Sequence, residues 1–159
     1  MRLLLVILFA ILYGTTSYAS DRKKEFIDMV QGCINEIDHT VQIPNKLIIG
    51  IAALESGWGT SRFTIEGNNL FGIRTFDLKK PNMKPLDNAK ADFGVKMYDN
   101  KCDSVRDFVN IIENNYNYSE FRKLRDEGMN LYVLINTLTE YSENPNYTTI
   151  LAKVVRNLW

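Results

Sequence analysis

The sequence predicts an α+β fold that is mainly α, with several helices and one small β-hairpin lobe. Apolar residues recur at intervals of three and four, the spacing that buries one face of a helix, in segments 26–41, 47–54, 105–112, 131–138 and 150–158. Two other segments, 71–76 and 92–98, alternate apolar and polar residues, as the strands of a hairpin do. The composition, 45% hydrophobic and 24% charged, is that of an ordinary globular protein.

The first 19 residues have the pattern of a signal peptide. Arg2 gives a positive start, an apolar run follows over residues 3–12, and Ser17-Tyr18-Ala19 has the small-x-small pattern of a cleavage site. Cleavage near Ala19 leaves residues 20–159 as one domain. We therefore expect an exported protein, periplasmic or secreted. An uncleaved membrane anchor is the alternative, because residues 13–18 are only mildly polar.

Charge and cysteine content narrow the class of protein further. Nineteen basic residues balance nineteen acidic ones, so no positive excess favours nucleic-acid binding. Cys33 and Cys102 permit one disulfide in an exported protein, or two buried free thiols. The single histidine, His39, lacks the paired cysteines of a zinc site, so a surface or capping position is expected for it.

The remaining elements are assigned from helix start signals, turns and periodicity. A polar excursion with prolines, residues 77–91, separates the two expected strands. The expected helices run from Asp21 to about Thr40, from Pro44 to Glu55, from Thr60 to Glu66, from Cys102 or Asp103 to about 113, from Ser119 to Asp126, from about 131 to near Tyr141, and from Thr148 to Leu158.

Glu55 is the candidate general acid. It ends the apolar run that begins after Pro44, and its side chain is expected to lie over Ile51 and Ala52 with Trp58 nearby. Such surroundings disfavour the charged carboxylate and raise its pKa, as an acid working near neutral pH requires. The alternative is a solvated charge, although a carboxylate at a helix C-terminus opposes the helix dipole.

Two motifs resemble a known family. Residues 53–61, ALESGWGTS, and residues 66–72, EGNNLFG, resemble the signature of the bacterial glucosaminidase family of peptidoglycan hydrolases, and most resemble its Bax-type members. The resemblance implies a lysozyme-like helical domain in which Glu55 is the catalytic acid and residues 69–72 lead into the β lobe. It also suggests that Trp58, Asn69 and Phe71 bind the substrate.

A closing motif, residues 141–147, supports the same resemblance. Family members place a tyrosine from this region in the cleft, where it assists catalysis. Tyr141 and Tyr147 both fit that position, and we list Tyr141 with the catalytic residues and Tyr147 with the substrate-binding residues. The alternative for either is an amphipathic side chain at a helix boundary.

A second catalytic group is not evident in the sequence. Glycosidases normally use two carboxyl groups, and the acids in or beside the expected lobe are Asp77, Asp87 and Asp92. We favour Asp92 because it begins a strand. A substrate with a 2-acetamido group can instead supply its own carbonyl oxygen as nucleophile. A retaining, an inverting and a substrate-assisted course therefore remain open.

The resemblance implies a glycoside hydrolase of the endo-β-N-acetylglucosaminidase type, which cleaves β-1,4 bonds of peptidoglycan at N-acetylglucosamine. Two alternatives remain: a lytic transglycosylase, which needs one Glu, and a wall-binding module without turnover. No cofactor or metal is implied, because the sequence has no phosphate-binding glycine loop and no cluster of metal ligands. The expected partner is the peptidoglycan glycan strand, bound by a monomer.

Overall fold

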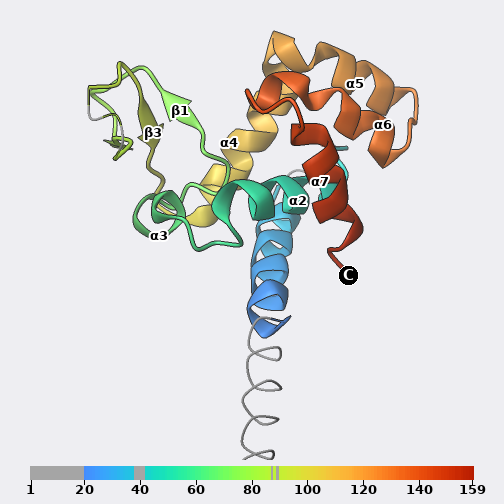
Figure 1. Ribbon diagram of the computed structural model, residues 1–159, viewed down its shortest axis with the longest axis horizontal. Coiled ribbons are helices and arrows are strands. Elements are labelled where there is room, and N and C mark those ends of the chain that lie inside the picture. The colour runs from blue at the N-terminus through green and yellow to red at the C-terminus, as the bar shows by residue number, and fades with distance from the viewer. Residues whose placement is uncertain (1–19, 38–41, 87, 89) are drawn as a thin grey trace, which may run out of the picture.

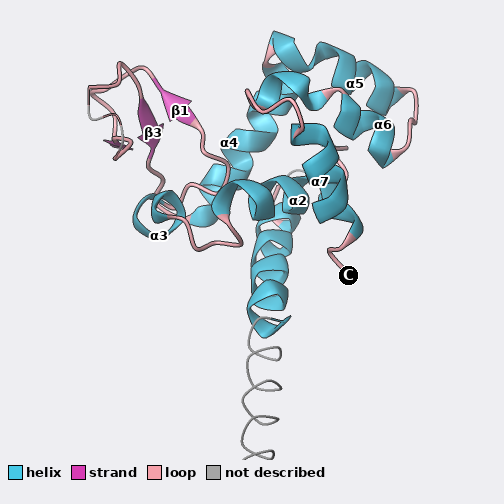
Figure 2. Ribbon diagram, in the orientation of Figure 1, coloured by secondary structure: helices cyan, strands magenta, loops and turns pink. Residues whose placement is uncertain are grey.

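The computed structural model describes residues 20–37, 42–86, 88 and 90–159. Helix α2 (Asn45–Ser56) lies in the middle, with the β lobe on one side and α5 and α6 on the other (Figures 1 and 2). In chain order the further elements are α3 (Arg62–Gly67), β1 (Arg74–Thr75), β2 (Asn82–Met83), β3 (Gly94–Lys96), α4 (Lys101–Asn114), the 3-10 helix η1 (Tyr116–Tyr118), α5 (Ser119–Asp126), α6 (Leu131–Asn136), the 3-10 helix η2 (Leu138–Tyr141) and α7 (Tyr147–Arg156).

Helix α2 forms the centre of the hydrophobic core. Every residue from Leu47 to Ala53 is buried, which explains why the sequence is apolar on all sides there. Gly50 allows close packing against α7, since a Cβ at this position would lie 2.4 Å from Cγ2 of Val155. The helix starts at Asn45, one residue after Pro44, and ends at Ser56 where Gly57 adopts a left-handed conformation.

The N-terminal helical segment, residues 20–35, packs on this core through Phe26, Val30 and Cys33. It is shorter than expected, because residues 36 and 37 form a turn and a bend.

Predictions for His39 and for the leader, residues 1–19, lie outside the described residues. Within the described part of the chain, no helix combines the length and apolarity needed to cross a membrane.

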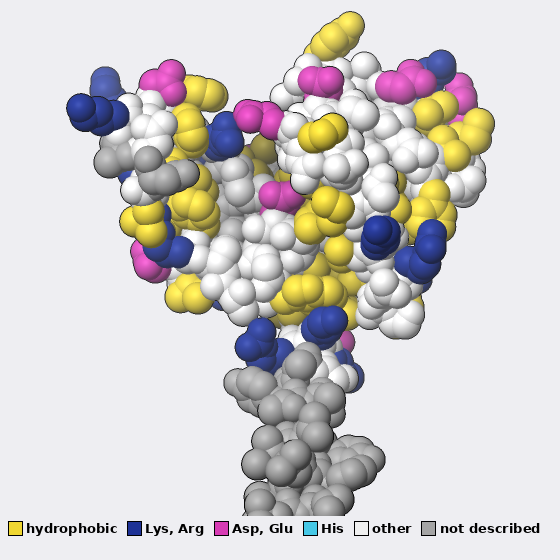
Figure 3. Space-filling view, in the orientation of Figure 1, with side chains coloured by type: hydrophobic (Ala, Val, Ile, Leu, Met, Phe, Trp, Pro, Cys, Tyr) yellow, Lys and Arg dark blue, Asp and Glu magenta, His cyan; other side chains and the backbone are white. Residues whose placement is uncertain are grey.

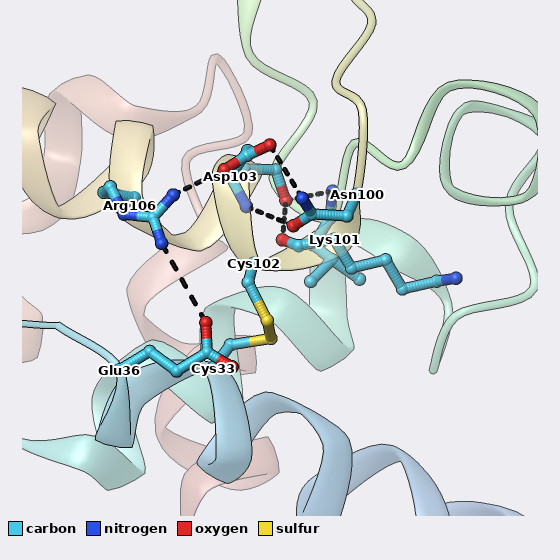
Figure 4. Close-up of a disulfide and its surroundings, with 9 residues drawn as sticks. Cys33, Glu36, Asn100, Lys101, Cys102, Asp103 and Arg106 are labelled. Carbon is cyan, nitrogen blue, oxygen red and sulfur yellow. Dashed lines mark hydrogen bonds and ion pairs between the residues drawn. A yellow bond between two sulfur atoms is a disulfide. The ribbon is translucent and has the colours of Figure 1, made fainter.

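A disulfide joins Cys33 to Cys102 and ties the N-terminal helical segment to the first turn of α4 (Figure 4). Next to it, Arg106 of α4 pairs with Asp103 and reaches Glu36 at 3.9 Å. The expected pairing of the two cysteines is therefore present in the structure, and the alternative of two free thiols is not.

The β lobe is a three-stranded antiparallel sheet in the order β1-β3-β2, where we expected a two-stranded hairpin. Arg74 pairs with Val95, and Met83 pairs with Val95 from the other side. The prediction of a plain polar excursion over residues 77–91 was wrong, because β2 lies within it. A strand of two residues is too short to show alternation, so periodicity did not reveal it.

The C-terminal half follows the expected pattern with shifted boundaries. Helix α5 has the predicted bounds, and α7 starts at Tyr147, one residue early. Helix α4 begins at Lys101, because the side chain of Asn100 accepts a hydrogen bond from the Asp103 amide. The helix expected to end near Tyr141 is divided into α6 and η2.

Candidate active site

A cleft of about 940 Å³ lies between the β lobe and the C-terminal helical part, and the surface is hollowed between them in Figure 3. Its volume lies near the upper end of the roughly 300–1,000 Å³ that is common for ligand pockets. The lining residues come from α2, the lobe, α4 and the segments around η1 and η2: Glu55, Phe71, Gly72, Ile73, Arg74, Phe76, Ile111, Asn115, Asn117, Tyr118, Thr139, Glu140, Tyr141, Ser142 and Glu143.

Glu55 lies in the last turn of α2, and its half-buried carboxyl lines the cleft. Loss of solvent around the carboxyl raises its pKa, while the hydroxyl of Tyr147 acts in the opposite direction and lowers it. The effect of burial is the larger one. The structure thus gives Glu55 the position and the direction of pKa shift that the sequence predicted for a proton donor.

The turn after Glu55 is held by its neighbour Ser56. The buried Ser56 hydroxyl donates to the carbonyl oxygen of Ala52 at 2.5 Å and accepts from the Gly59 amide at 2.8 Å. Gly57 and Trp58 both have positive φ, of 57° and 59°, so the chain reverses sharply there. The serine and glycine of the motif therefore fix where α2 ends and hold Glu55 in place.

Gly72 leaves open space in front of the Glu55 carboxyl. Its φ is 65°, and a Cβ built on it would lie 3.9 Å from Oε2 of Glu55. Any larger side chain at this position would extend into that space. The loop that enters the β lobe thus runs close to the acid and still leaves room for a ligand atom to approach it.

Tyr141 and Tyr147 form a stacked pair beside Glu55, with ring centroids 5.5 Å apart. Burial is the main reason that the pKa values of both hydroxyls are raised, so both are neutral hydrogen-bond donors at ordinary pH. The Tyr141 hydroxyl donates to the carbonyl oxygen of Phe71 at 3.1 Å. It therefore holds the loop at the base of the lobe.

The Tyr147 hydroxyl has a different environment. Tyr147 is 4% exposed, and within the described structure its hydroxyl makes no hydrogen bond of standard geometry. It nevertheless lies close enough to Glu55 for each group to shift the pKa of the other. Of the two candidate tyrosines, Tyr141 lines the cleft and bonds to backbone, whereas the buried hydroxyl of Tyr147 interacts with the Glu55 carboxyl.

Asn69 and Phe71 build the cleft wall from inside. Asn69 is 1% exposed; its amide nitrogen donates to the carbonyl oxygens of Ile73 and Lys96, and its oxygen accepts from the amides of Phe71 and Ile73. With these bonds made, the side chain has no free group for a sugar, so its position does not support the predicted substrate contact. Phe71 lines the cleft as expected, although its ring stacks on Phe108 at 4.2 Å and is buried.

Trp58 does not lie where the sequence suggested. It is absent from the cleft lining, and its ring packs edge-on against Phe26, with centroids 5.8 Å apart, under the ammonium of Lys23. The reversal of the chain at Gly57 directs the indole toward the N-terminal helical segment. We therefore correct the expectation that Trp58 lines a sugar subsite in this cleft.

The expected second acid, Asp92, is exposed and does not line the cleft. Strand β3 runs from the outer end of the lobe toward α4, where Lys96 meets Asp107 at 2.7 Å. Asp92, two residues before the strand, therefore lies at the outer end of the lobe. Asp77 is also exposed and outside the lining, and Asp87 lies outside the described residues.

Two acids that sequence reasoning missed, Glu140 and Glu143, line the cleft on the helical side. They flank Tyr141, in the segment that the sequence had already singled out, so a search for acids around that tyrosine would have found them. Arg74 and Phe76 of the lobe were also missed. Among the described residues, no group of three or more His, Cys, Asp and Glu side chains is arranged to hold a metal ion.

Comparison with known proteins gives two similar relatives. Protein bax of Escherichia coli is 31% identical over 106 residues, which are 63% of this chain and 37% of that protein. Peptidoglycan hydrolase FlgJ of Salmonella typhimurium is 23% identical over 128 residues, which are 73% of this chain and 40% of that protein. The chain thus matches only about two-fifths of the length of each of these relatives.

The fold is also that of a solved structure, the catalytic domain of the autolysin Auto from Listeria monocytogenes. The TM-score is 0.69 at 20% identity, and the match covers 86% of this chain and 84% of that one. The model of the glucosaminidase family, described as mannosyl-glycoprotein endo-beta-N-acetylglucosaminidase, matches residues 32–158. That span includes α2 with Glu55, the whole β lobe and the tyrosine pair, and we conclude that the chain belongs to the glucosaminidase family.

Proposed function

We propose that this protein hydrolyses β-1,4 glycosidic bonds of peptidoglycan at N-acetylglucosamine, with Glu55 as the general acid. The observation that carries the proposal is the half-buried Glu55 carboxyl, whose pKa is raised by burial and which lines a cleft of about 940 Å³. Family membership and the similarity to FlgJ, a peptidoglycan hydrolase, support the same substrate class.

In the proposed reaction the protonated Glu55 gives its proton to the glycosidic oxygen as the bond to the anomeric carbon breaks. The space beside Gly72 lets that oxygen approach the carboxyl. The buried hydroxyl of Tyr147 supports this step, because it can donate a hydrogen bond to the Glu55 carboxylate that remains. Burial opposes the charged carboxylate, and a neutral donor beside it offsets part of that cost.

Two schemes can complete the reaction. Glu140 or Glu143, on the opposite wall, can act as a base for water, which is the two-carboxylate scheme. The 2-acetamido group of the substrate can instead attack the anomeric carbon, and water then opens the cyclic intermediate. Replacing Glu140 and Glu143 by Gln, one at a time, separates the two schemes, since only the first requires a carboxylate in that wall.

The main test is Glu55→Gln, which keeps the shape and removes the acidic proton. We expect release of reducing ends from purified peptidoglycan to fall by about 10²–10⁴-fold. The matched control is Glu127→Gln, at an exposed residue outside the cleft, which leaves the rate unchanged. Full activity in Glu55→Gln would exclude the proposed role.

Analysis of the products by mass spectrometry separates the hydrolase from its alternatives. Hydrolysis leaves a reducing sugar at the new end. An anhydro end instead would identify a lytic transglycosylase. If the wild-type protein binds insoluble wall and releases nothing, it is a wall-binding module.

We also propose that the protein is exported. The leader-like pattern of residues 1–19 and the disulfide between Cys33 and Cys102 support an oxidising, extracytoplasmic compartment. N-terminal sequencing of protein recovered from the periplasm or medium tests the proposal, and Ser20 or Asp21 is the expected first residue. Recovery in the membrane fraction with Met1 or Arg2 still present would show an uncleaved anchor.

A further inference from the structure

Arg74 is the single positively charged side chain among the described residues that line the cleft. The other charged lining residues are Glu55, Glu140 and Glu143. Arg74 lies in β1, on the lobe side, whereas Glu140 and Glu143 lie on the helical side. The two walls of the cleft therefore carry opposite charges, and an anionic group on a ligand is favoured only near the lobe.

The Arg74 guanidinium is held in place by an aromatic ring. It lies over the ring of Phe93, 4.5 Å from the centroid, and Phe76 packs edge-on against Phe93 at 6.3 Å. Within the described part of the chain, no carboxylate lies within ion-pair distance of Arg74. The planar fork of N–H donors is thus oriented but not occupied by another protein charge.

The distance of Arg74 from the acid is set by the chain. Gly72 is next to the Glu55 carboxyl, and Arg74 follows two residues later. The Cα atoms of Gly72 and Arg74 are therefore at most about 7 Å apart. A glycan with its scissile oxygen at Glu55 therefore places an adjoining sugar within reach of Arg74. A guanidinium prefers carboxylates, which it binds through two parallel hydrogen bonds.

We propose that Arg74 is a specificity residue that binds a carboxylate on the glycan strand. The carboxylate belongs to a sugar that adjoins the bond that Glu55 protonates. This inference rests on the proposed function. Alternate sugars of peptidoglycan carry a lactyl ether, whose carboxyl is either free or extended by a peptide with its own carboxylates. The shared chemistry is an anionic carboxylate beside the sugar ring, which an uncharged N-acetylglucosamine polymer lacks.

The test compares one glycan in charged and uncharged form. The substrates are peptide-free peptidoglycan strands, the same strands with the lactyl carboxyl converted to the methyl ester, and strands that keep their peptides. We expect wild-type kcat/KM to fall by about tenfold on esterification, through KM, and this preference to weaken at high salt. Arg74→Gln should lose the preference, and Arg74→Lys should keep part of it.

Two further variants separate charge recognition from general binding. Phe76, 73% exposed at the rim of the cleft, offers a ring on which a sugar can pack. Phe76→Ala should therefore weaken the charged and the esterified glycan equally. Lys79→Gln removes an exposed cation of the same lobe outside the cleft and should alter neither value. Equal preference in the wild type and in Arg74→Gln, or the same loss in Lys79→Gln, would overturn the proposal.

The peptide-bearing strands identify the source of the carboxylate. A preference for peptide-free strands that depends on Arg74 points to the lactyl group, and a preference for peptide-bearing strands points to the peptide. Binding of the same glycans to Glu55→Gln and to the double variant Glu55→Gln/Arg74→Gln separates this inference from the hydrolase proposal. An Arg74-dependent preference in binding, without turnover by the wild type, would support carboxylate recognition and refute hydrolysis.

Discussion

The two sides of the cleft are built in different ways. The acid is carried by α2, which is buried from Leu47 to Ala53 and packs on α7. The opposite side is a lobe whose strands have two or three residues each. A helix inside the core resists local opening, whereas a small sheet with much exposed surface opens more easily. The structure therefore combines a candidate acid on a rigid helix with an opposite wall that opens more easily.

The lobe is tied to the rest of the protein by polar contacts more than by a core of its own. Asn69 bonds to backbone at both ends of the lobe, and Arg62 donates to the carbonyl oxygen of Lys84 at 2.6 Å. Lys96 and Tyr98 both reach Asp107 of α4 at 2.7 Å. Breaking a contact in the helical part of the protein should therefore lower global stability. Breaking a contact at the lobe should first affect substrate binding.

The largest expected effect is on the stability of the helical part of the protein and comes from removing the disulfide. Its loop spans 69 residues, for which chain entropy gives roughly 4 kcal/mol of stabilisation. The variant Cys33→Ala/Cys102→Ala should lose about that much unfolding free energy in urea. The activity of the folded protein should be retained, because neither cysteine lines the cleft. A denaturation midpoint that reductant does not change would argue against a structural disulfide.

Next is Asn69→Ala, which acts on the base of the lobe. The change leaves the buried backbone amides of Phe71 and Ile73 without the acceptor that Asn69 provides, so a loss of about 3 kcal/mol is expected. KM for peptidoglycan should also rise, because the loop between Asn69 and Gly72 shapes the cleft. Asn136→Ala, at an exposed residue of α6, is the control for both measurements. An unchanged KM would mean that the lobe does not depend on this amide.

A smaller effect is expected for Asp107→Asn, which weakens the link between β3 and α4. The carboxylate holds Lys96 and Tyr98 and is partly exposed, so the loss should be about 1 kcal/mol. The change is local if the variant accelerates amide hydrogen exchange, relative to the wild type, more in the lobe than in α2. The control is Asp126→Asn, a surface acid paired with Arg125 at 2.9 Å. Equal acceleration in both regions would contradict a separate lobe.

The smallest effect on stability concerns Glu55 itself. Burial raises its pKa above 4.5, so the folded state holds a proton there that the unfolded state has lost at the same pH. The unfolding free energy should therefore fall as pH rises from about 4.5 through the raised pKa, and Glu55→Gln should remove this part of the pH dependence. Activity should fall over the same limb, since the acid must be protonated. Identical pH profiles of stability in the two proteins would show that the folded structure does not shift this pKa.

Sequence periodicity was reliable where one element buries its own face. The α2 segment, α4 and α7 were found from apolar spacing, because helix packing repeats within ten or so residues. It failed for β2, whose two residues exist as a strand only because β3 lies beside them. The motif around Glu55 was informative for a local reason too: Ser56 and Gly57 fix the end of the helix that carries the acid.

Positions in the cleft were harder to predict, since they depend on contacts between distant segments. Trp58 lies in the turn directly after Ser56 and Gly57 and still packs against Phe26, and Asn69 uses all its bonds on backbone. Asp92 was favoured because it was expected to begin a strand, but β3 starts at Gly94 and its direction puts Asp92 at the outer end of the lobe. Glu140 and Glu143 reach the cleft only through the fold of η2 and the segment after it.

The sequence alone determined the helical class, the small β lobe and the candidate acid, because apolar spacing and the motif around Glu55 are encoded within short stretches. Only the tertiary structure decided which side chains face that acid. The buried Tyr147 hydroxyl, the acids beside Tyr141 and the positive charge of Arg74 come from segments up to 92 residues away from Glu55 in the chain. Such distances are closed by core packing, and no local pattern records them.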